Sequence, residues 1–199
     1  RHSSSAASDV YKRQHIDGAR IFNASISTSL SPKRMAREYD SISVCLSKGL
    51  GAPVGSVLVG SNKTLYKAHR WRKMFGGGMR QAGVLAAAGI YSLENNVHRL
   101  SEDHDRAMEI ASALDRMDSY EVDLKQVQTN MVYVKCDKGG AEALISRLEG
   151  MGIQALTIDS STIRMVTHLH ITDDDVQRTI SALESVSYTH LTLPTNCVV

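Results

Sequence analysis

A strict alternation of apolar and polar side chains marks the stretch on which the rest of the chain depends. The alternating sets are Ile42, Val44 and Leu46 on one side and Ser43, Cys45 and Ser47 on the other. A period of two residues is typical of a half-buried β-strand. Lys48 and glycines at positions 49, 51 and 55 follow directly. The pattern therefore predicts a strand that ends at Leu46 and a glycine-rich turn that begins with a lysine.

The chain before about residue 97 has the pattern of an α/β layout. The further elements it predicts are strands around residue 16 and at 56–59, and helices at 32–38, 61–74 and 80–90. Ser31 followed by Pro32 is typical of a helix start, and Ser61 or Asn62 is suited to cap the helix at 61–74. The helix at 80–90 is small and apolar on nearly every side, so we expect neighbours to pack closely around it.

A different pattern begins near residue 98. Ser101 precedes acidic residues that suit the first turn of a helix. An apolar stripe follows in the same helix, at Ala107, Ile110, Ala111 and Leu114. The remaining elements are predicted to be strands at 131–134, 153–158 and 162–166, a helix at 141–151 and a closing helix from 172. They predict an antiparallel sheet with helices on one face, in a small α+β domain at 98–185.

Both ends of the chain are predicted to be foreign to the protein. Residues 4–14 match the translation of a sequencing-library transposase adapter, and the reverse complement of the same DNA, read in a shifted frame, gives residues 186–195. Two unrelated peptides encoded by one oligonucleotide in opposite orientations are not expected by chance. We therefore assign 1–14 and 186–199 to adapter-derived tails and exclude them from the fold.

Without these tails the charges balance. The chain has 23 Lys or Arg and 21 Asp or Glu, and the tails hold three basic residues and one acidic residue, which leaves 20 of each. A net charge of zero gives no sign of nucleic-acid or membrane binding, and no run reaches the roughly twenty apolar residues of a membrane span. Cys45 and Cys136 lack a metal-ligand spacing, so we expect buried, reduced thiols in a cytoplasmic protein.

The candidate chemistry centres on Lys48 and on Asp17, which precedes it by 31 positions. A lysine that is withdrawn from water has a lowered pKa and becomes a usable amine nucleophile. An aspartate before a lysine is the order found in pyridoxal phosphate enzymes, where the carboxylate pairs with the pyridinium nitrogen and the lysine forms a Schiff base. The alternative is an ordinary surface lysine in a strand-to-loop turn.

Three segments together resemble the low-specificity L-threonine aldolases. They are His15-Ile16-Asp17-Gly18-Ala19-Arg20, the run SKGLGAPVGS at 47–56 and the run RWRKMFGGGMRQAG at 70–83. The resemblance extends from residue 15 to 185 in the family's order and implies a fold-type I PLP-dependent transferase. It makes 15–97 the C-terminal part of the large, PLP-binding domain and 98–185 the small C-terminal domain. Because whole members are about twice as long, we expect the chain to be the C-terminal half of such a protein.

The resemblance also implies a role for each candidate residue. Lys48 holds pyridoxal 5'-phosphate and Asp17 keeps its ring nitrogen protonated. Arg20 lies beside the cofactor and, with Arg164, binds the substrate carboxylate, a group that a planar guanidinium pairs at two points. Arg80 contacts the cofactor phosphate across a subunit interface. Two plain alternatives stay open, a salt bridge near a helix cap for Arg80 and an edge-strand charge for Arg164.

Three other features receive plain interpretations. The basic run along 61–74 is a solvated face, or one turned towards the cofactor or a neighbouring subunit, and no nucleic-acid site is predicted there. The glycines at 76–78 lack the spacing of a dinucleotide fingerprint. His168 and His170 have no third ligand, so no metal site is predicted.

The implied activity is PLP-dependent aldol cleavage of L-threonine or L-allo-threonine to glycine and acetaldehyde, by a cytoplasmic homo-oligomer, a dimer or tetramer. We expect it of an intact carbon–carbon lyase rather than of this chain alone, because the phosphate-binding turn at a helix N-terminus and the ring-stacking histidine are not found. Two alternatives stay open: another fold-type I PLP lyase or aminotransferase, and a non-catalytic truncated product. A fold resemblance by itself does not establish activity.

Overall fold

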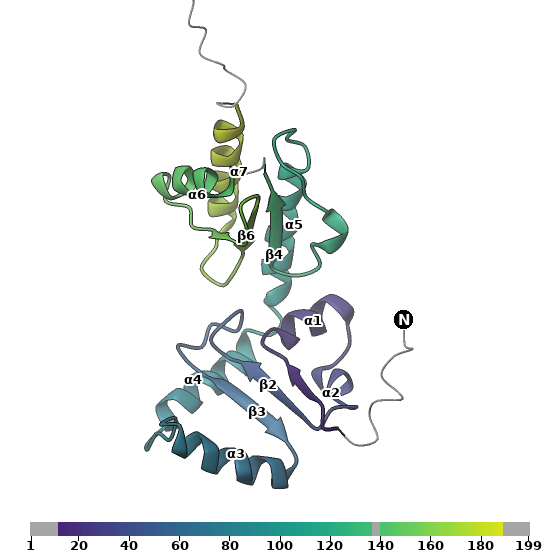
Figure 1. Cartoon of the computed structure of the whole chain (residues 1–199), viewed down its shortest axis with the longest axis vertical. Helices are drawn as coiled ribbons and strands as arrows, with labels where there is room; N and C mark the ends of the chain where they lie inside the picture. The colour runs from purple at the N-terminus through teal and green to yellow at the C-terminus, as the bar shows by residue number, and fades with distance from the viewer. Residues whose placement is uncertain (1–11, 137–139, 189–199) are drawn as a thin grey trace, which may run out of the picture. The chain divides into compact units, whose positions relative to one another are not determined.

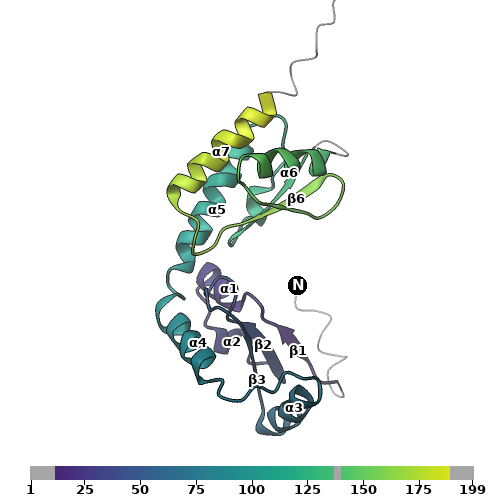
Figure 2. The same cartoon turned by 90° about the vertical axis from the view of Figure 1, so that its left-hand side faces the viewer.

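The computed structural model describes residues 12–136 and 140–188. The chain divides into two compact units, Arg1–Leu100 and Ser101–Val199, whose elements are drawn in Figure 1 and Figure 2. Most of both predicted tails, residues 1–11 and 189–199, lies outside the described residues.

The first unit contains a mixed three-stranded sheet. Its elements are β1 (His15–Asp17), α1 (Ile21–Thr28), α2 (Pro32–Met35), β2 (Ser41–Cys45), β3 (Ser56–Gly60), α3 (Asn62–Met74) and α4 (Gly83–Asn95). The strand order is β1-β2-β3, with β1 parallel and β3 antiparallel to β2. Because α1 and α2 connect two neighbouring parallel strands, the α/β layout predicted for this region is confirmed.

Both predicted helix caps of this unit are present. The Ser31 hydroxyl accepts a hydrogen bond from the backbone N–H of Arg34 at 3.3 Å, with proline at the first helical position. The Ser61 hydroxyl accepts from the backbone N–H of Thr64, also at 3.3 Å. Each bond satisfies a donor that the helix itself leaves unpaired, which explains why α2 and α3 begin where the sequence predicts.

Two predicted helices of the first unit have other bounds, and one helix, α1, is not predicted by the sequence patterns. The helix α2 ends at Met35 rather than at residue 38. The helix α4 begins at Gly83 rather than at residue 80. Gln81 has a positive φ of 52°, a left-handed conformation that a right-handed helix cannot contain.

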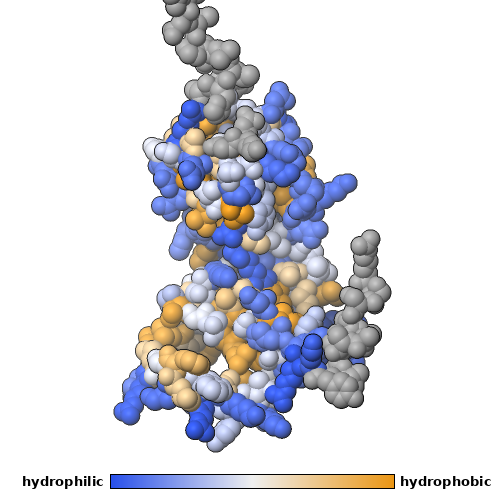
Figure 3. Space-filling model, in the orientation of Figure 1, coloured by the Kyte–Doolittle hydropathy of each residue, from blue (hydrophilic) through white to orange (hydrophobic). Residues whose placement is uncertain are grey.

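The core of the first unit is small, and α4 is not packed on all sides. The buried cluster consists of Leu46, Leu50, Ala52 and Leu100, with Phe22, Ile26 and Val97 against it. On α4 only Gly89 and Ser92 are buried, and Val84 is 70% exposed. Figure 3 shows hydrophobic residues at the surface over this helix. The expected close packing fails because the described residues cover only one face of α4.

The second unit contains an antiparallel sheet in the order β4-β6-β5. Its elements are α5 (Leu100–Leu114, which starts at the last residue of the first unit), the short 3₁₀ helix η1 (Leu124–Gln126), β4 (Met131–Lys135), α6 (Gly140–Gly150), β5 (Leu156–Thr157), β6 (Thr162–Val166) and α7 (Asp173–Tyr188). Figure 2 shows α5 and α7 on the same side of the sheet. The predicted antiparallel sheet is confirmed.

The apolar stripe predicted for α5 forms one side of the core of the second unit. Ala107, Ile110, Ala111 and Leu114 are all at most 4% exposed. They join a cluster of 17 buried residues, against four in the first unit. The second unit therefore contains the larger hydrophobic core among the described residues.

The ends of two elements differ from the prediction. The strand β5 is limited to Leu156–Thr157, because Ile153 N–H donates to the carbonyl of Leu148 at the end of α6 rather than to the sheet. The helix α7 continues to Tyr188, three residues into the segment assigned to a tail. Val186 is only 3% exposed and belongs to the buried cluster, so this segment contributes to the fold as described.

Candidate functional site

Asp17 and Lys48 belong to the same edge of the sheet in the first unit. Asp17 is the last residue of β1, and it is paired with Ser43 of the parallel strand β2. Lys48 follows the end of β2 at Cys45 by three residues. The carboxyl ends of neighbouring parallel strands meet at one edge of an α/β sheet, which is where such sheets bind ligands. The structure thus places the two residues that the sequence singles out at the same edge of one sheet.

The backbone around Asp17 is fixed by its neighbours. Gly18 N–H donates to the carbonyl of Ser43 at 2.8 Å, and a Cβ on Gly18 would lie 2.6 Å from the side chain of Ile42, so only glycine fits. The Ala19 N–H donates to one carboxylate oxygen of Asp17 at 3.1 Å. The other oxygen accepts no hydrogen bond from the described residues and is available to a donor such as a pyridinium N–H.

Lys48 lies in a compact turn, but its side chain is exposed. Its carbonyl accepts a hydrogen bond from Gly51 N–H at 2.9 Å, and Gly51 has the left-handed φ of 71° that favours glycine. Ala52 N–H closes the turn by donating to the carbonyl of Leu46 at 3.0 Å. The withdrawal of Lys48 from water that we expect from the sequence is therefore not found among the described residues.

Arg20 carries a buried donor without a partner. It stands at the N-terminal cap position of α1, directly after the β1 segment. Its side-chain Nε is buried and has no hydrogen-bond partner among the described residues. With Asp17 it lines a pocket of about 430 Å³. Because an unpaired buried donor costs free energy, this arrangement fits an anionic group of a ligand.

Arg80 lies in an anion-compatible pocket of about 370 Å³ in the same unit. The other charged or titratable side chains that line it are all basic, namely His69, Arg70, Arg72 and Lys73. Arg72 donates through Nη2 to His69 Nδ1 at 3.1 Å. Arg80 itself is exposed and forms no ion pair with a described residue. The salt-bridge alternative for Arg80 is therefore wrong for this structure.

The charge balance predicted for the chain conceals a strong asymmetry. The first unit has 15 Lys or Arg and 5 Asp or Glu, whereas the second has 8 and 16. No acidic residue occurs between Asp40 and Glu94. The balance of the whole chain therefore does not hold within the first unit, to which the basic run on α3 belongs, and this unit as a whole favours anionic ligands.

Arg164 lies at the centre of the sheet in the second unit. It is paired with Tyr133 of β4 on one side and with Leu156 of β5 on the other. The edge-strand alternative is therefore wrong. Its Nε is buried and has no hydrogen-bond partner among the described residues. A guanidinium that is held in a central strand with an unpaired donor is suited to bind a carboxylate.

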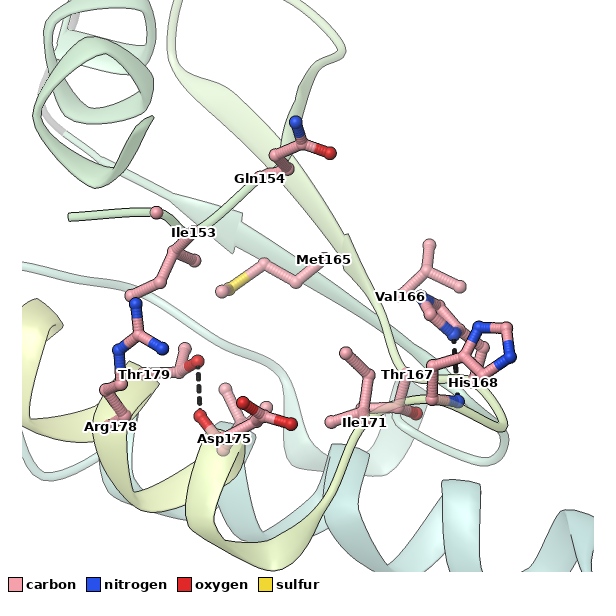
Figure 4. A pocket seen from close by; sticks show the side chains of 13 residues that line it. Ile153, Gln154, Met165, Val166, Thr167, His168, Ile171, Asp175, Arg178 and Thr179 are labelled. Atoms are coloured by element: carbon pink, nitrogen blue, oxygen red, sulfur yellow. Dashed lines mark hydrogen bonds between the residues drawn. The ribbon is translucent and has the colours of Figure 1, made fainter. Parts of the chain in front are cut away.

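A pocket of about 330 Å³ in the second unit contains none of the predicted site residues. Figure 4 shows Arg178 of α7 directed towards Ile153 on its wall, and its Nη2 donates to the carbonyl of Met151 at 2.9 Å. His168 and His170 also line it, with their rings 5.7 Å apart edge to face.

Among residues 12–136 and 140–188 no three His, Cys, Asp or Glu side chains form a metal-binding group. Cys45 and Cys136 are half-buried rather than buried, and neither forms a disulfide bond with a described residue.

Asp175, on the wall of this pocket, should make stability depend on pH. Its carboxylate accepts hydrogen bonds from the backbone N–H and the hydroxyl of Thr172, and these bonds, with the charge of Arg178, lower its pKa below 3.8. A depressed pKa contributes stability that is complete above the unfolded value and is lost as the pH falls through the folded value. Asp175→Asn should therefore flatten the loss of unfolding free energy below about pH 4, measured by urea unfolding.

Asp174→Asn is the matched control for Asp175→Asn. Asp174 is exposed in the same turn of α7 and accepts no hydrogen bond from the residues that the structure describes. Its substitution should leave the acid limb of the stability curve unchanged. Equal effects of the two substitutions would contradict the role of the Thr172 bonds.

The residues present fit pyridoxal phosphate. The first unit offers an amine at Lys48, a free carboxylate oxygen at Asp17 for the ring nitrogen, and the unpaired guanidinium nitrogen of Arg20 for an anionic group. When bound, this cofactor supplies a ring that withdraws electrons and stabilises negative charge at the α-carbon of an amino acid. The fold is that of part of a fold-type I pyridoxal phosphate enzyme.

The chain belongs to the beta-eliminating lyase family, whose model matches residues 4–137. Enzymes of this family depend on pyridoxal phosphate, which confirms the predicted cofactor class. The match begins inside the segment that the sequence assigns to an N-terminal tail and lies mostly in the first unit.

Curated relatives agree with the predicted resemblance. The low-specificity L-threonine aldolase 1 of Arabidopsis thaliana is 45% identical over 178 residues, which are 88% of this chain and 50% of that protein. The low specificity L-threonine aldolase of Escherichia coli K12 is 46% identical over 162 residues, 81% of this chain and 47% of that protein. The chain thus spans about half the length of the curated relatives it matches.

A solved structure supports the fold. The threonine aldolase of Leishmania major matches with a TM-score of 0.69 over 87% of this chain and 51% of that one, at 18% identity. At this identity the likeness shows the fold alone. No helix within the described ranges has the length and hydrophobicity to cross a membrane.

Sequence reasoning does not single out Asn23. This side chain of α1 is only 3% exposed and lies beside the turn that follows Lys48. A polar residue inside a run with Ile21, Phe22 and Ile26 is the one sequence signal that could indicate a buried amide.

Proposed function

We propose that the chain is the part of a pyridoxal phosphate-dependent carbon–carbon lyase that contains the cofactor-binding lysine and the residues that bind the substrate. The whole enzyme would cleave L-threonine or L-allo-threonine to glycine and acetaldehyde. The observation that carries the proposal is the placement of Asp17 and Lys48 at the carboxyl ends of two adjacent parallel strands. The names of the relatives favour this substrate class over that of an aminotransferase.

Three residues of the first unit would hold the cofactor. Lys48 would bind it through its amine, and Asp17 would accept a hydrogen bond from the ring nitrogen and so keep the proton there. Arg20 would offer its unpaired Nε to an anionic group, on the cofactor or on the substrate carboxylate. The Asp17 oxygen and the Arg20 nitrogen that these roles use have no partner among the described residues.

Two further arginines, Arg80 and Arg164, would bind the cofactor phosphate and the substrate. Arg80, with the basic side chains around it, would bind the cofactor phosphate, by contact with the neighbouring subunit's cofactor. Arg164 would bind the substrate carboxylate at two points through its guanidinium, because its Nε is buried and unpaired on a central strand. Holding the carboxylate fixes the orientation of the bond to be cleaved. No residue of the chain is assigned as the base for the β-hydroxyl proton.

The reaction is tested with a chimera, because the chain spans half of its relatives. The part of the Escherichia coli relative that aligns with this chain is replaced by the chain's own residues. The products measured are glycine and acetaldehyde from L-threonine, glycine and formaldehyde from L-serine, and pyruvate from L-alanine with an α-keto acid as amino acceptor. Cleavage of threonine is expected to exceed reaction with the other two. Transamination of alanine without cleavage of threonine would instead favour an aminotransferase.

We propose that copies of the whole protein associate into a dimer or tetramer through the surface of α3 and α4. Beside the basic residues of α3, its exposed side chains include large apolar ones: Tyr66 is 81%, Phe75 82%, Val84 70% and Tyr91 64% exposed. A patch of this kind exceeds the scattered apolar residues of a typical monomer surface and marks an interaction site. Light scattering after size exclusion should give a mass above one chain, and Val84→Asp with Tyr91→Asp should lower it.

The two units would correspond to the C-terminal part of the large domain, 15–97, and to the small domain, 98–185. The separate cores of the units support this division. A cytoplasmic location stays a prediction, and Cys45 and Cys136, which form no disulfide bond with a described residue, are compatible with it.

A further inference from the structure

Asn23 is buried where the first unit has few buried polar groups. It is 3% exposed, and with Ser92 it is one of two buried polar side chains in the described part of this unit. The Ser92 hydroxyl is accounted for by its bond to the carbonyl of Ala88, one turn earlier in α4. Burying an amide is costly unless its surroundings compensate, and Asn23 does interact with its neighbours, so its amide is held in place.

One of these neighbours is Gly49, the residue after Lys48. A Cβ on Gly49 would lie 3.2 Å from Oδ1 and 3.6 Å from Nδ2 of Asn23, and 2.9 Å from Cδ2 of Leu100. Leu100 is fully buried and Gly49 is buried as well. The turn that carries Lys48 is therefore in close contact with the Asn23 amide, without room for a side chain in between.

The helix α1, which carries Asn23, is also hydrogen-bonded to the residue that follows Asp17. It begins one residue after Arg20, and Ile21 N–H donates to the carbonyl of Gly18 at 3.0 Å. Gly18 directly follows Asp17 and is bonded to Ser43 of β2. Because α1 is a continuous helix of eight residues, the contact at Asn23 and the position of Asp17 are held by one element.

We propose that Asn23 is a positioning residue, which sets the place of Lys48 relative to Asp17 through its contact with Gly49. The inference rests on the proposed function, in which Lys48 binds the cofactor. Asn23 would touch neither cofactor nor substrate. It would act on the backbone of the turn, and misplacement of a reacting group by about 1 Å can cost up to about a hundredfold in rate.

The test compares how fast pyridoxal phosphate labels Lys48 and Lys63 in the same full-length chain. Lys63 is exposed on α3 and serves as an internal reference. Labelled lysines are fixed with borohydride and counted by peptide mass spectrometry at several pH values. The Lys48 to Lys63 ratio is expected to fall about tenfold in Asn23→Ala. Gly49→Ala perturbs the same contact from the turn and should act in the same direction.

Gly83→Ala is the matched control, because a Cβ at Gly83 would meet no atom within 4 Å. It should leave the ratio unchanged. The double variant Asn23→Ala with Gly49→Ala is the sharper test, since removal of the amide relieves the approach at 3.2 Å while the one to Leu100 Cδ2 at 2.9 Å stays. Its effect should be smaller than the product of the two single effects, as expected for residues in contact. Circular dichroism verifies that each variant is folded.

The outcomes separate the inference from the function on which it rests. A wild-type chain that labels Lys48 no faster than Lys63 would contradict the proposed function, and the inference with it. A wild-type preference for Lys48 that persists in folded Asn23→Ala and Gly49→Ala chains would overturn the inference alone. A purely structural role would lower the free energy of unfolding and leave the ratio of the folded chain unchanged.

Discussion

Replacing Lys48 by alanine is expected to abolish covalent attachment of pyridoxal phosphate at the site. Attachment requires a primary amine, and no other lysine occurs between Lys33 and Lys63. Nothing near the turn can therefore substitute for it. The measurement is the visible absorbance of the purified chain after unbound cofactor is removed, with wild type and Lys48→Ala side by side. The wild-type chain should retain a band that the variant lacks.

Two further variants test the origin of the band. One asks whether it requires the amine of Lys48 rather than its charge, and the other asks whether surface lysines contribute to it. Lys48→Arg retains a cation but offers no usable amine, because arginine stays protonated, so it should lose the band as alanine does. Lys63→Ala removes an exposed lysine of α3 and should leave the band intact. A band of equal strength in wild type and Lys48→Ala would show that the cofactor reacts with surface lysines in general.

The second unit is the part of the fold that its sequence predicts best. The apolar stripe of α5 and the alternation in β4 and β6 each predict one buried face. The structure buries these faces, as the side chains of Val132, Val134 and Ile163 show. Periodicity works here because the chain contains both sides of the core. The shortening of β5 was not predictable, since it follows from a single backbone bond at the end of α6.

The first unit shows where such patterns fail. The helix α1 is eight residues long and rich in Ser, Thr and Ile, a composition that gives no clear helical period. The apolar surface of α4 correctly indicates a need for packing, but its partners are not among the described residues. An apolar pattern can show that a helix face needs a packing partner without showing which segment packs on it.

The residues of the candidate site are likewise predicted only in part by the sequence. Asp17 and Lys48 are recognisable from their order in the chain, and the parallel pairing of β1 and β2 gives that order a geometric meaning. The positioning proposed for Asn23 depends on a contact across 26 residues, which no local pattern contains. Whether Arg164 lay on an edge or a central strand could also not be decided before the strand order was known.

The second large effect is expected from Leu148→Ala, in the core of the second unit. Leu148 of α6 is fully buried within the main apolar cluster. Removing a buried leucine side chain loses its transfer free energy and leaves a cavity, which together cost about 2–5 kcal/mol. Because small domains are stabilised by only about 5–15 kcal/mol, this unit should unfold at a much lower urea concentration. Amide hydrogen exchange in β4 and β6 reports the unfolding of this unit.

Leu156→Ala gives the matched control, since Leu156 lies in the same unit on β5 but is 56% exposed. An exposed leucine has little transfer free energy to lose, and its substitution should change the unfolding free energy by less than about 0.5 kcal/mol. If the two variants destabilised the second unit equally, the core would not be centred on α6 as described. A large difference between them would locate the stability of this unit in its buried cluster and thereby explain how Arg164 is held in a rigid central strand.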